Sequence, residues 1–164
     1  MHMFEQQDSA QTLAEGIREY YERNPGLATG RALSPEAQEF FRCHDAAHVI
    51  FGCGNNLDDE AVVKIASIFG TSGGFGILRG YRLHESFEIY KSLRVMDVLT
   101  SILRSIAIVP RTIYRCCFQQ RRKWQWDRFD EYMHLPLKEI RQSFGIKVAH
   151  FGKTRKGTVS ALCK

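Results

Sequence analysis

The sequence lacks several patterns that would assign it directly to a class of protein. No C-x-x-C pair occurs among its five cysteines, which argues against a zinc ribbon and against a thioredoxin-like redox site. The first residues show neither the apolar core of a secretory signal nor the arginine-rich character of a transit peptide. Together with the odd number of cysteines, this predicts a reducing, cytoplasmic location.

Long apolar runs, internal repeats and low-complexity linkers are also missing. Arg94, Asp97 and Arg104 interrupt the longest apolar stretch, so we expect no membrane-spanning helix. The chain has 164 residues, 44% of them hydrophobic, which is the size and composition of one globular domain over residues 1–164. Residues 153–164 are a candidate disordered tail.

Helical periodicity dominates the pattern that is present. It predicts helices at about residues 9–23, 34–51, from Asn56 or Asp58 to about 70, 84–108, 111–133 and 135–145. The glycine-rich segment 70–76 lacks the lysine of a phosphate-binding loop and predicts a hinge or tight turn. A short strand at 146–151 is the exception. We therefore predict an all-α fold, a single compact helical domain of about six helices with an apolar cleft.

Positive charge is concentrated late in the chain. The formal net charge is +5, and residues 111–128 alone carry an excess of the same size around two tryptophans. Cations beside tryptophans are typical of a helix at an anionic membrane surface, with these expected contacts: Arg115, Arg121, Arg122, Lys123 and Trp124. A solvated helix with its aromatic side chains in the core is the alternative. We do not expect a nucleic-acid partner, because no recognised nucleic-acid motif accompanies the charge.

Three candidate metal ligands lie together on the predicted helix 34–51. On a helical projection His44, His48 and Asp45 share an arc of about 100°, beside apolar positions. Histidines four residues apart are neighbours whose imidazoles can reach one ion. Cys43 and Cys53 point away from this arc, so we exclude them as ligands and expect them to be small packing residues.

Glu60 is the fourth candidate ligand. On a continuous helix it would lie about 18 Å from His48, out of reach of a shared ion. The Gly-Cys-Gly-Asn-Asn break at residues 52–56 allows the chain to reverse and bring Glu60 back to the same ion. Two imidazoles and two carboxylates suit zinc, and also iron(II) or manganese. The alternative is that both histidines are hydrogen-bonded core residues and that Glu60 favours a helix N-terminus.

The pattern H-D-A-A-H, followed by Glu60 after eleven residues, resembles the metal signature of the Coq-four family of ubiquinone (coenzyme Q) biosynthesis proteins. A second stretch, 129–146, resembles the closing segment of that family, in which P-L-x-x-x-R precedes a terminal Gly-Ile. The two stretches bracket about residues 34–146. The resemblance implies an all-helical protein with a metal, most simply zinc, held by His44, Asp45, His48 and Glu60.

The resemblance also implies a function. It predicts a ubiquinone-biosynthesis protein, peripheral to the inner membrane of a bacterial-type cell, that binds a polyprenylated quinone precursor or isoprenoid lipid. Members have been viewed as catalysts of oxidative ring decarboxylation and as organisers of the biosynthetic complex. Other ubiquinone-biosynthesis proteins, and a second copy of this chain, are the candidate protein partners. The apolar run 87–108 would be core or would line a channel for the isoprenoid tail.

This sequence departs from the family pattern in two ways. It is shorter than typical members, and Ala46-Ala47 stand where members carry bulkier side chains, which predicts a larger pocket or a different substrate. Two rival functions stay open. One is a metal-dependent phosphohydrolase built on His44 and Asp45, which would need further ligands such as His84 or Asp97. The other is a non-catalytic lipid-presenting scaffold in which the metal only joins two helices.

Overall fold

The protein is all-α, as predicted. The computed structural model describes residues 2–25, 34–82, 106 and 108–148, and no strand occurs within them. Its α-helices are α1 (Leu13–Arg23), α3 (Pro35–Phe51), α4 (Leu57–Gly70) and α7 (Leu137–Phe144). Residues 108–114 are also helical and run into the π-helical turn η2 (Arg115–Gln119). The 3-10 helices are η1 (Gly74–Arg82) and η3 (Phe129–Tyr132).

Local capping signals set most helix boundaries. The hydroxyl of Ser34 caps α3, with Pro35 at the first helical position, and the amide oxygen of Asn56 caps α4. Helix α1 begins at Leu13, later than the predicted residue 9, because Thr12 and Glu15 form a capping box. Helix α7 ends as predicted at Gly145, which adopts a left-handed conformation.

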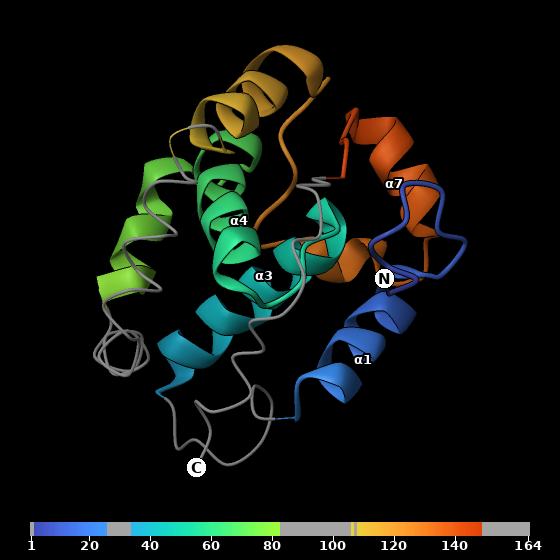
Figure 1. Ribbon diagram of the computed structural model, residues 1–164. Helices are drawn as coiled ribbons and strands as arrows, with labels where there is room; N and C mark the ends of the chain where they lie inside the picture. The colour runs from blue at the N-terminus through green and yellow to red at the C-terminus, as the bar shows by residue number, and fades with distance from the viewer. Residues whose placement is uncertain (1, 26–33, 83–105, 107, 149–164) are drawn as a thin grey trace.

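Helix α3 is the central element of the fold. Every residue from Cys43 to Phe51 is buried, so the second half of α3 is enclosed on all sides. It packs against α1, α4 and η1. In Figure 1, α3 and α4 lie between η1 on one side and α1 with α7 on the other. The candidate ligands His44 and His48 are therefore carried by the most buried helix of the described chain.

The predicted helix 111–133 is wrong beyond Gln119. Residues 120–128 are not helical, because Trp124 is tied to the end of α4. Its amide donates to the carbonyl of Gly70 at 2.9 Å, and its carbonyl accepts from the amide of Ser72 at 2.7 Å. The Trp124 side chain is fully buried and packs on Tyr132 and Phe144. Trp124 is therefore a core residue, and its predicted contact with a membrane surface is wrong.

Other predictions are corrected or lie outside the described residues. The glycine-rich segment does turn at 71–73, but it then forms η1 rather than a loose hinge. Residues 146–148 form no strand. The remainder of the predicted strand, almost all of the predicted helix 84–108 and the tail 153–164 lie outside the described ranges. Among the described helices, none is long and apolar enough to cross a bilayer.

A buried arginine on α7 joins three parts of the fold. The guanidinium of Arg141 is fully buried and donates to the carbonyls of Val49 and Ile50 at 2.7 and 2.9 Å. These are carbonyls of the last turn of α3, which have no partner within their own helix. Arg141 also donates to the carbonyls of Phe4 and Gln6, each at 2.5 Å. Burial lowers the pKa of Arg141 to about 10, which keeps it charged at neutral pH.

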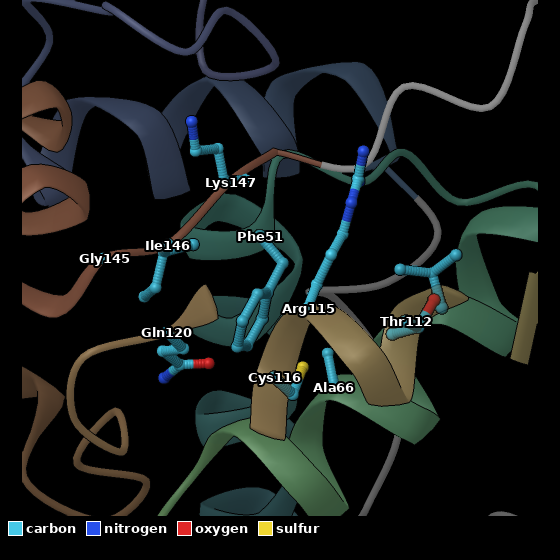
Figure 2. A pocket seen from close by; sticks show the side chains of 10 residues that line it. Phe51, Ala66, Thr112, Arg115, Cys116, Gln120, Gly145, Ile146 and Lys147 are labelled. Atoms are coloured by element: carbon cyan, nitrogen blue, oxygen red, sulfur yellow. The ribbon is translucent and has the colours of Figure 1, made fainter. Parts of the chain in front are cut away.

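A small pocket lies where α3, α4 and the helix at 108–119 meet (Figure 2). Its lining includes the apolar side chains of Phe51, Val62 and Ala66 together with the cationic side chains of Arg115 and Lys147. It fits the predicted apolar cleft only in part, because several of its lining side chains are polar. Ala46 and Ala47 are fully buried in the core and are not among its lining residues, so they do not enlarge it.

Removing the Arg141 side chain is expected to destabilise the protein strongly. Arg141→Ala leaves the carbonyls of Phe4 and Ile50 without a donor in the described chain and removes a large buried side chain, which we expect to cost about 3 kcal/mol or more of the free energy of unfolding. Urea denaturation followed by circular dichroism measures this loss. The matched control is Arg128→Ala, since Arg128 is exposed and paired with Glu131 on the surface. It should leave the free energy of unfolding nearly unchanged, and similar losses in the two variants would contradict the assigned role of Arg141.

Candidate metal centre

His44 and His48 converge from successive turns of α3. Both side chains are buried, and their Nε2 atoms lie 3.2 Å apart. The spacing of four residues puts the two imidazoles on one face of the helix, as the sequence predicts. Their rings meet edge to face, with centroids 4.7 Å apart. Two nitrogen lone pairs can thus be directed at one point in the interior.

Glu60 reaches the same point from α4. Its two carboxylate oxygens lie 3.2 Å from Nε2 of His48 and 3.6 Å from Nε2 of His44. The chain reverses between the helices because Gly52 ends α3 at φ 67°, where a side chain would be strained and its Cβ would lie 2.7 Å from Val148. The predicted role of the break at 52–56 is thus confirmed.

The three residues form a compact group that could hold a metal ion. One ligand atom from each lies within 4.8 Å of the others. Around a tetrahedral zinc with bonds of about 2.0–2.1 Å, neighbouring ligand atoms are about 3.3–3.4 Å apart. The two Nε2 atoms lie 3.2 Å apart, which is close to this value, whereas the two Glu60 distances are to different carboxylate oxygens, Oε1 at 3.2 Å from His48 and Oε2 at 3.6 Å from His44. His44, His48 and Glu60 therefore could hold a divalent metal ion and would leave a fourth position for another ligand.

Hydrogen bonds from the surrounding chain orient both imidazoles. Nδ1 of His48 lies 2.8 Å from the carbonyl oxygen of Gly54, which can only accept. Nδ1 of His48 therefore carries the hydrogen, and Nε2 is left as a free ligand atom. The loop is held in turn by Asp59, which accepts from the amide of Gly54 at 2.9 Å. Nδ1 of His44 lies 3.1 Å from the hydroxyl of Tyr81, on η1.

The electrostatics of the group favour a bound cation. Burial opposes a charge on His48, but the nearby Glu60 carboxylate outweighs it and raises the pKa of His48. Burial likewise opposes a charge on Glu60, but His48 and then His44 hold the pKa of Glu60 well below its usual range. A metal ligand must be an unprotonated imidazole, so a metal competes here with a proton and its affinity should rise with pH.

Aromatic rings enclose the two histidines. Tyr20 stacks on His48 with a centroid distance of 5.1 Å, and Phe40 stacks on His44 at 6.0 Å. Tyr81 meets the ring of His44 edge to face at 5.6 Å. These rings restrict the imidazoles to one orientation and lower the water content around them, which strengthens any charge interaction in the group.

Asp45, the predicted fourth ligand, does not join this group in the structure. Its side chain points about 100° around α3 from His44, and its Oδ2 accepts a hydrogen bond from the hydroxyl of Tyr21 at 2.9 Å. Asp45 is buried, and burial raises its pKa, while the nearby His44 and His48 oppose the rise. It thus contributes negative charge beside the imidazoles without being one of the grouped ligand atoms.

The excluded cysteines are core residues, as predicted. Cys43 and Cys53 are buried and pack with the apolar side chains around α3. Burial, followed by the nearby Glu39, raises the pKa of the Cys43 thiol to about 12. Burial also raises the pKa of Cys53 well above its usual value. Neither thiol is suited to become the thiolate that binds zinc.

The predicted cationic contacts have different surroundings. Arg121, Arg122 and Lys123 are exposed, whereas Arg115 is half-buried and donates to the carbonyl of Val148 at 3.3 Å. Three large exposed apolar side chains precede the three exposed cations in the sequence, namely Ile106, Tyr114 and Phe118. The rival ligands His84 and Asp97 lie outside the described residues.

Sequence reasoning did not identify the residues that orient the ligands. Tyr81 follows a glycine-rich segment without helical periodicity, so no pattern in the sequence placed it against His44. The carbonyl of Gly54 carries no side-chain signal at all. Tyr20 and Tyr21 were recognisable only as residues of one helix, and neither the stacking on His48 nor the bond to Asp45 follows from their spacing.

Comparisons with known proteins assign the chain to no family. No family model matches the chain, and neither a curated protein nor a solved structure matches it. The interpretation of the site rests on its own geometry and on the sequence patterns described above.

Substitutions of single carboxylates should distinguish the candidate metal ligand Glu60 from nearby carboxylates that do not bind the metal. Glu60→Gln removes one of three grouped ligands, and we expect the zinc affinity, measured by competition with a chromophoric chelator, to fall by about 100-fold or more. Asp45→Asn should lower it by less than about tenfold, because Asp45 is not in the group. Asp58→Asn removes a charge from the same first turn of α4 and serves as the control. A loss for Asp45→Asn equal to that for Glu60→Gln would restore Asp45 as a ligand.

Proposed function

We propose that this chain is a divalent-metal protein of ubiquinone biosynthesis, with zinc as the ion that fits best. The observation that carries the metal is the convergence of His44, His48 and Glu60, with one ligand atom from each within 4.8 Å of the others. The resemblance of H-D-A-A-H and of segment 129–146 to the Coq-four family supports the pathway. The ligand is then a polyprenylated quinone precursor.

The residues of the group have separate tasks in this proposal. His44, His48 and Glu60 hold the ion and leave one position toward the substrate, and the rings of Tyr20, Phe40 and Tyr81 restrict water. A divalent ion held by these residues would supply Lewis-acid polarisation of a carboxylate or phenolic oxygen of the ring. Asp45 offers buried negative charge beside the imidazoles. Decarboxylation of the prenylated ring is the reaction that this arrangement suits.

A structural role for the metal is the second candidate. It is favoured by one observation, since two ligands come from α3 and the third from α4, so an ion would join the two helices. The protein would then present a lipid to its partners without catalysis. The phosphohydrolase alternative is less well supported, because it requires no contribution from Glu60.

Turnover by the purified protein distinguishes these roles. We expect zinc-loaded protein to convert a prenylated 4-hydroxybenzoate without partner proteins, and Glu60→Gln to lose that activity along with its zinc. Product and co-purified lipids are measured by mass spectrometry. If turnover is absent while zinc raises the unfolding temperature through binding to the folded state, the metal is structural. If removal of the metal with a chelator leaves turnover unchanged, the catalytic role is also excluded.

We also propose an anionic membrane surface as a partner, on the side that carries Tyr114 and Phe118. These rings contact each other and are 55% and 76% exposed, and the exposed cations Arg121, Arg122 and Lys123 follow closely in the sequence. Exposed aromatic side chains beside cations suit the boundary between lipid headgroups and acyl chains. Tyr114 and Phe118 are thus the proposed membrane contacts in place of the buried Trp124.

Flotation with liposomes tests the membrane partner. Binding should require anionic lipid and weaken at high salt, because exposed charges are screened. Phe118→Ser should reduce binding several-fold. Phe75→Ser removes an equally exposed phenylalanine on η1 and should leave binding unchanged. Equal binding to neutral and anionic liposomes, or equal effects of the two substitutions, would contradict this surface.

A further inference from the structure

The two histidines of the group are oriented by different kinds of hydrogen-bond partner. Nδ1 of His48 faces the backbone carbonyl of Gly54, which can only accept. Nδ1 of His44 faces the hydroxyl of Tyr81, which can donate or accept. Neutral His48 is therefore confined to the Nδ1–H tautomer. The Tyr81 hydroxyl, in contrast, can bond to His44 in either of its two neutral tautomers.

Tyr81 is held against His44 by close packing. Its ring meets Phe40 edge to face at 5.0 Å, and the ammonium of Lys64 lies 5.5 Å from its centroid. The preceding residue is Gly80. Any side chain there would clash with Phe40, because a Cβ would lie only 2.0 Å from Cδ2 of Phe40. The approach of η1 to α3 therefore requires glycine at this position. This contact is what brings the Tyr81 hydroxyl to 3.1 Å from Nδ1 of His44.

Without a cation, the short contact between the two Nε2 atoms needs a hydrogen. They lie 3.2 Å apart, and with both rings neutral the hydrogen of His48 is on Nδ1. The hydrogen on this side must then belong to Nε2 of His44, which faces two acceptors, Nε2 of His48 at 3.2 Å and Oε2 of Glu60 at 3.6 Å. In that state Nδ1 of His44 is unprotonated and accepts from the Tyr81 hydroxyl.

A bound cation reverses this arrangement at His44. Both Nε2 atoms must offer lone pairs to the ion, so the hydrogen of His44 must be on Nδ1. We propose that cation binding switches the tautomer of His44 but not that of His48, and that Tyr81 is the positioning residue that permits it by reversing its hydrogen bond. Nε2 loses a proton to solvent and Nδ1 gains one, so the ring stays neutral. This inference rests on the proposed metal site.

Nitrogen NMR of the imidazoles tests the switch directly. In protein labelled with ¹⁵N-histidine at alkaline pH, where both rings are neutral, correlation spectra report which ring nitrogen carries hydrogen. We expect His44 to pass from the Nε2–H to the Nδ1–H form when zinc is added. His48 should keep the Nδ1–H form in both states.

Two tyrosine substitutions, one at the group and one in the core away from it, provide the affinity test. Tyr81→Phe keeps the ring but removes the hydroxyl, and we expect zinc affinity to fall by about tenfold, the usual effect of losing a partner of a metal-binding histidine. Tyr132→Phe is the control, because the Tyr132 ring packs in the core against Trp124 and Phe144 and belongs to no part of the ligand group. It should leave affinity unchanged.

Gly80→Ala provides a second route to the same result. It pushes η1 away from Phe40, so it should lower zinc affinity, and it should add no further loss in the Tyr81→Phe background. Chemical denaturation of the metal-free variants checks that each one folds. Wild-type protein that does not bind zinc would overturn the proposed function itself. Zinc binding with one unchanged His44 tautomer, or with equal affinities for Tyr81→Phe and Tyr132→Phe, would overturn only the switch.

Discussion

The burial of the second half of α3 is the constraint on which the rest of the structure depends. Residues 43–51 are all buried, so every polar group on this stretch needs a partner from elsewhere in the chain. Arg141 provides it for the last carbonyls, Tyr21 for Asp45, and Gly54 for His48. The hydrogen bonds that satisfy the buried polar groups of α3 are therefore also the ones that orient its candidate ligands.

Much of the helical framework could be predicted because its signals are local. Ser34-Pro35 and Asn56 cap their helices through neighbouring atoms, so short stretches of sequence are enough to locate α3 and α4. The grouping of His44 and His48 follows from helical spacing alone. Glu60 needed one further step, the recognition that a glycine-rich break lets the chain reverse, and the left-handed Gly52 supplies that reversal.

The failures of prediction share a cause, which is a partner far away in the sequence. Residues 120–128 have no strong helix breaker, but the bonds of Trp124 to Gly70 and Ser72 outweigh local helix propensity. Asp45 lies within the predicted arc, yet the hydroxyl of Tyr21 on another helix takes its carboxylate. Tyr81 reaches His44 from a segment with no periodicity. None of these pairings leaves a signal in the spacing of the residues involved.

Arg141 also constrains the order in which the chain can fold. Its donors reach Ile50, 91 positions earlier, and Phe4, 137 positions earlier. Contacts between such distant segments form late, because a long loop must close before they contribute any stability. During synthesis, α3 and α4 emerge well before α7, and the end of α3 remains without its donor until then. Completion of the core, and with it the fixed geometry around His48, is therefore a late event in the life of the nascent chain.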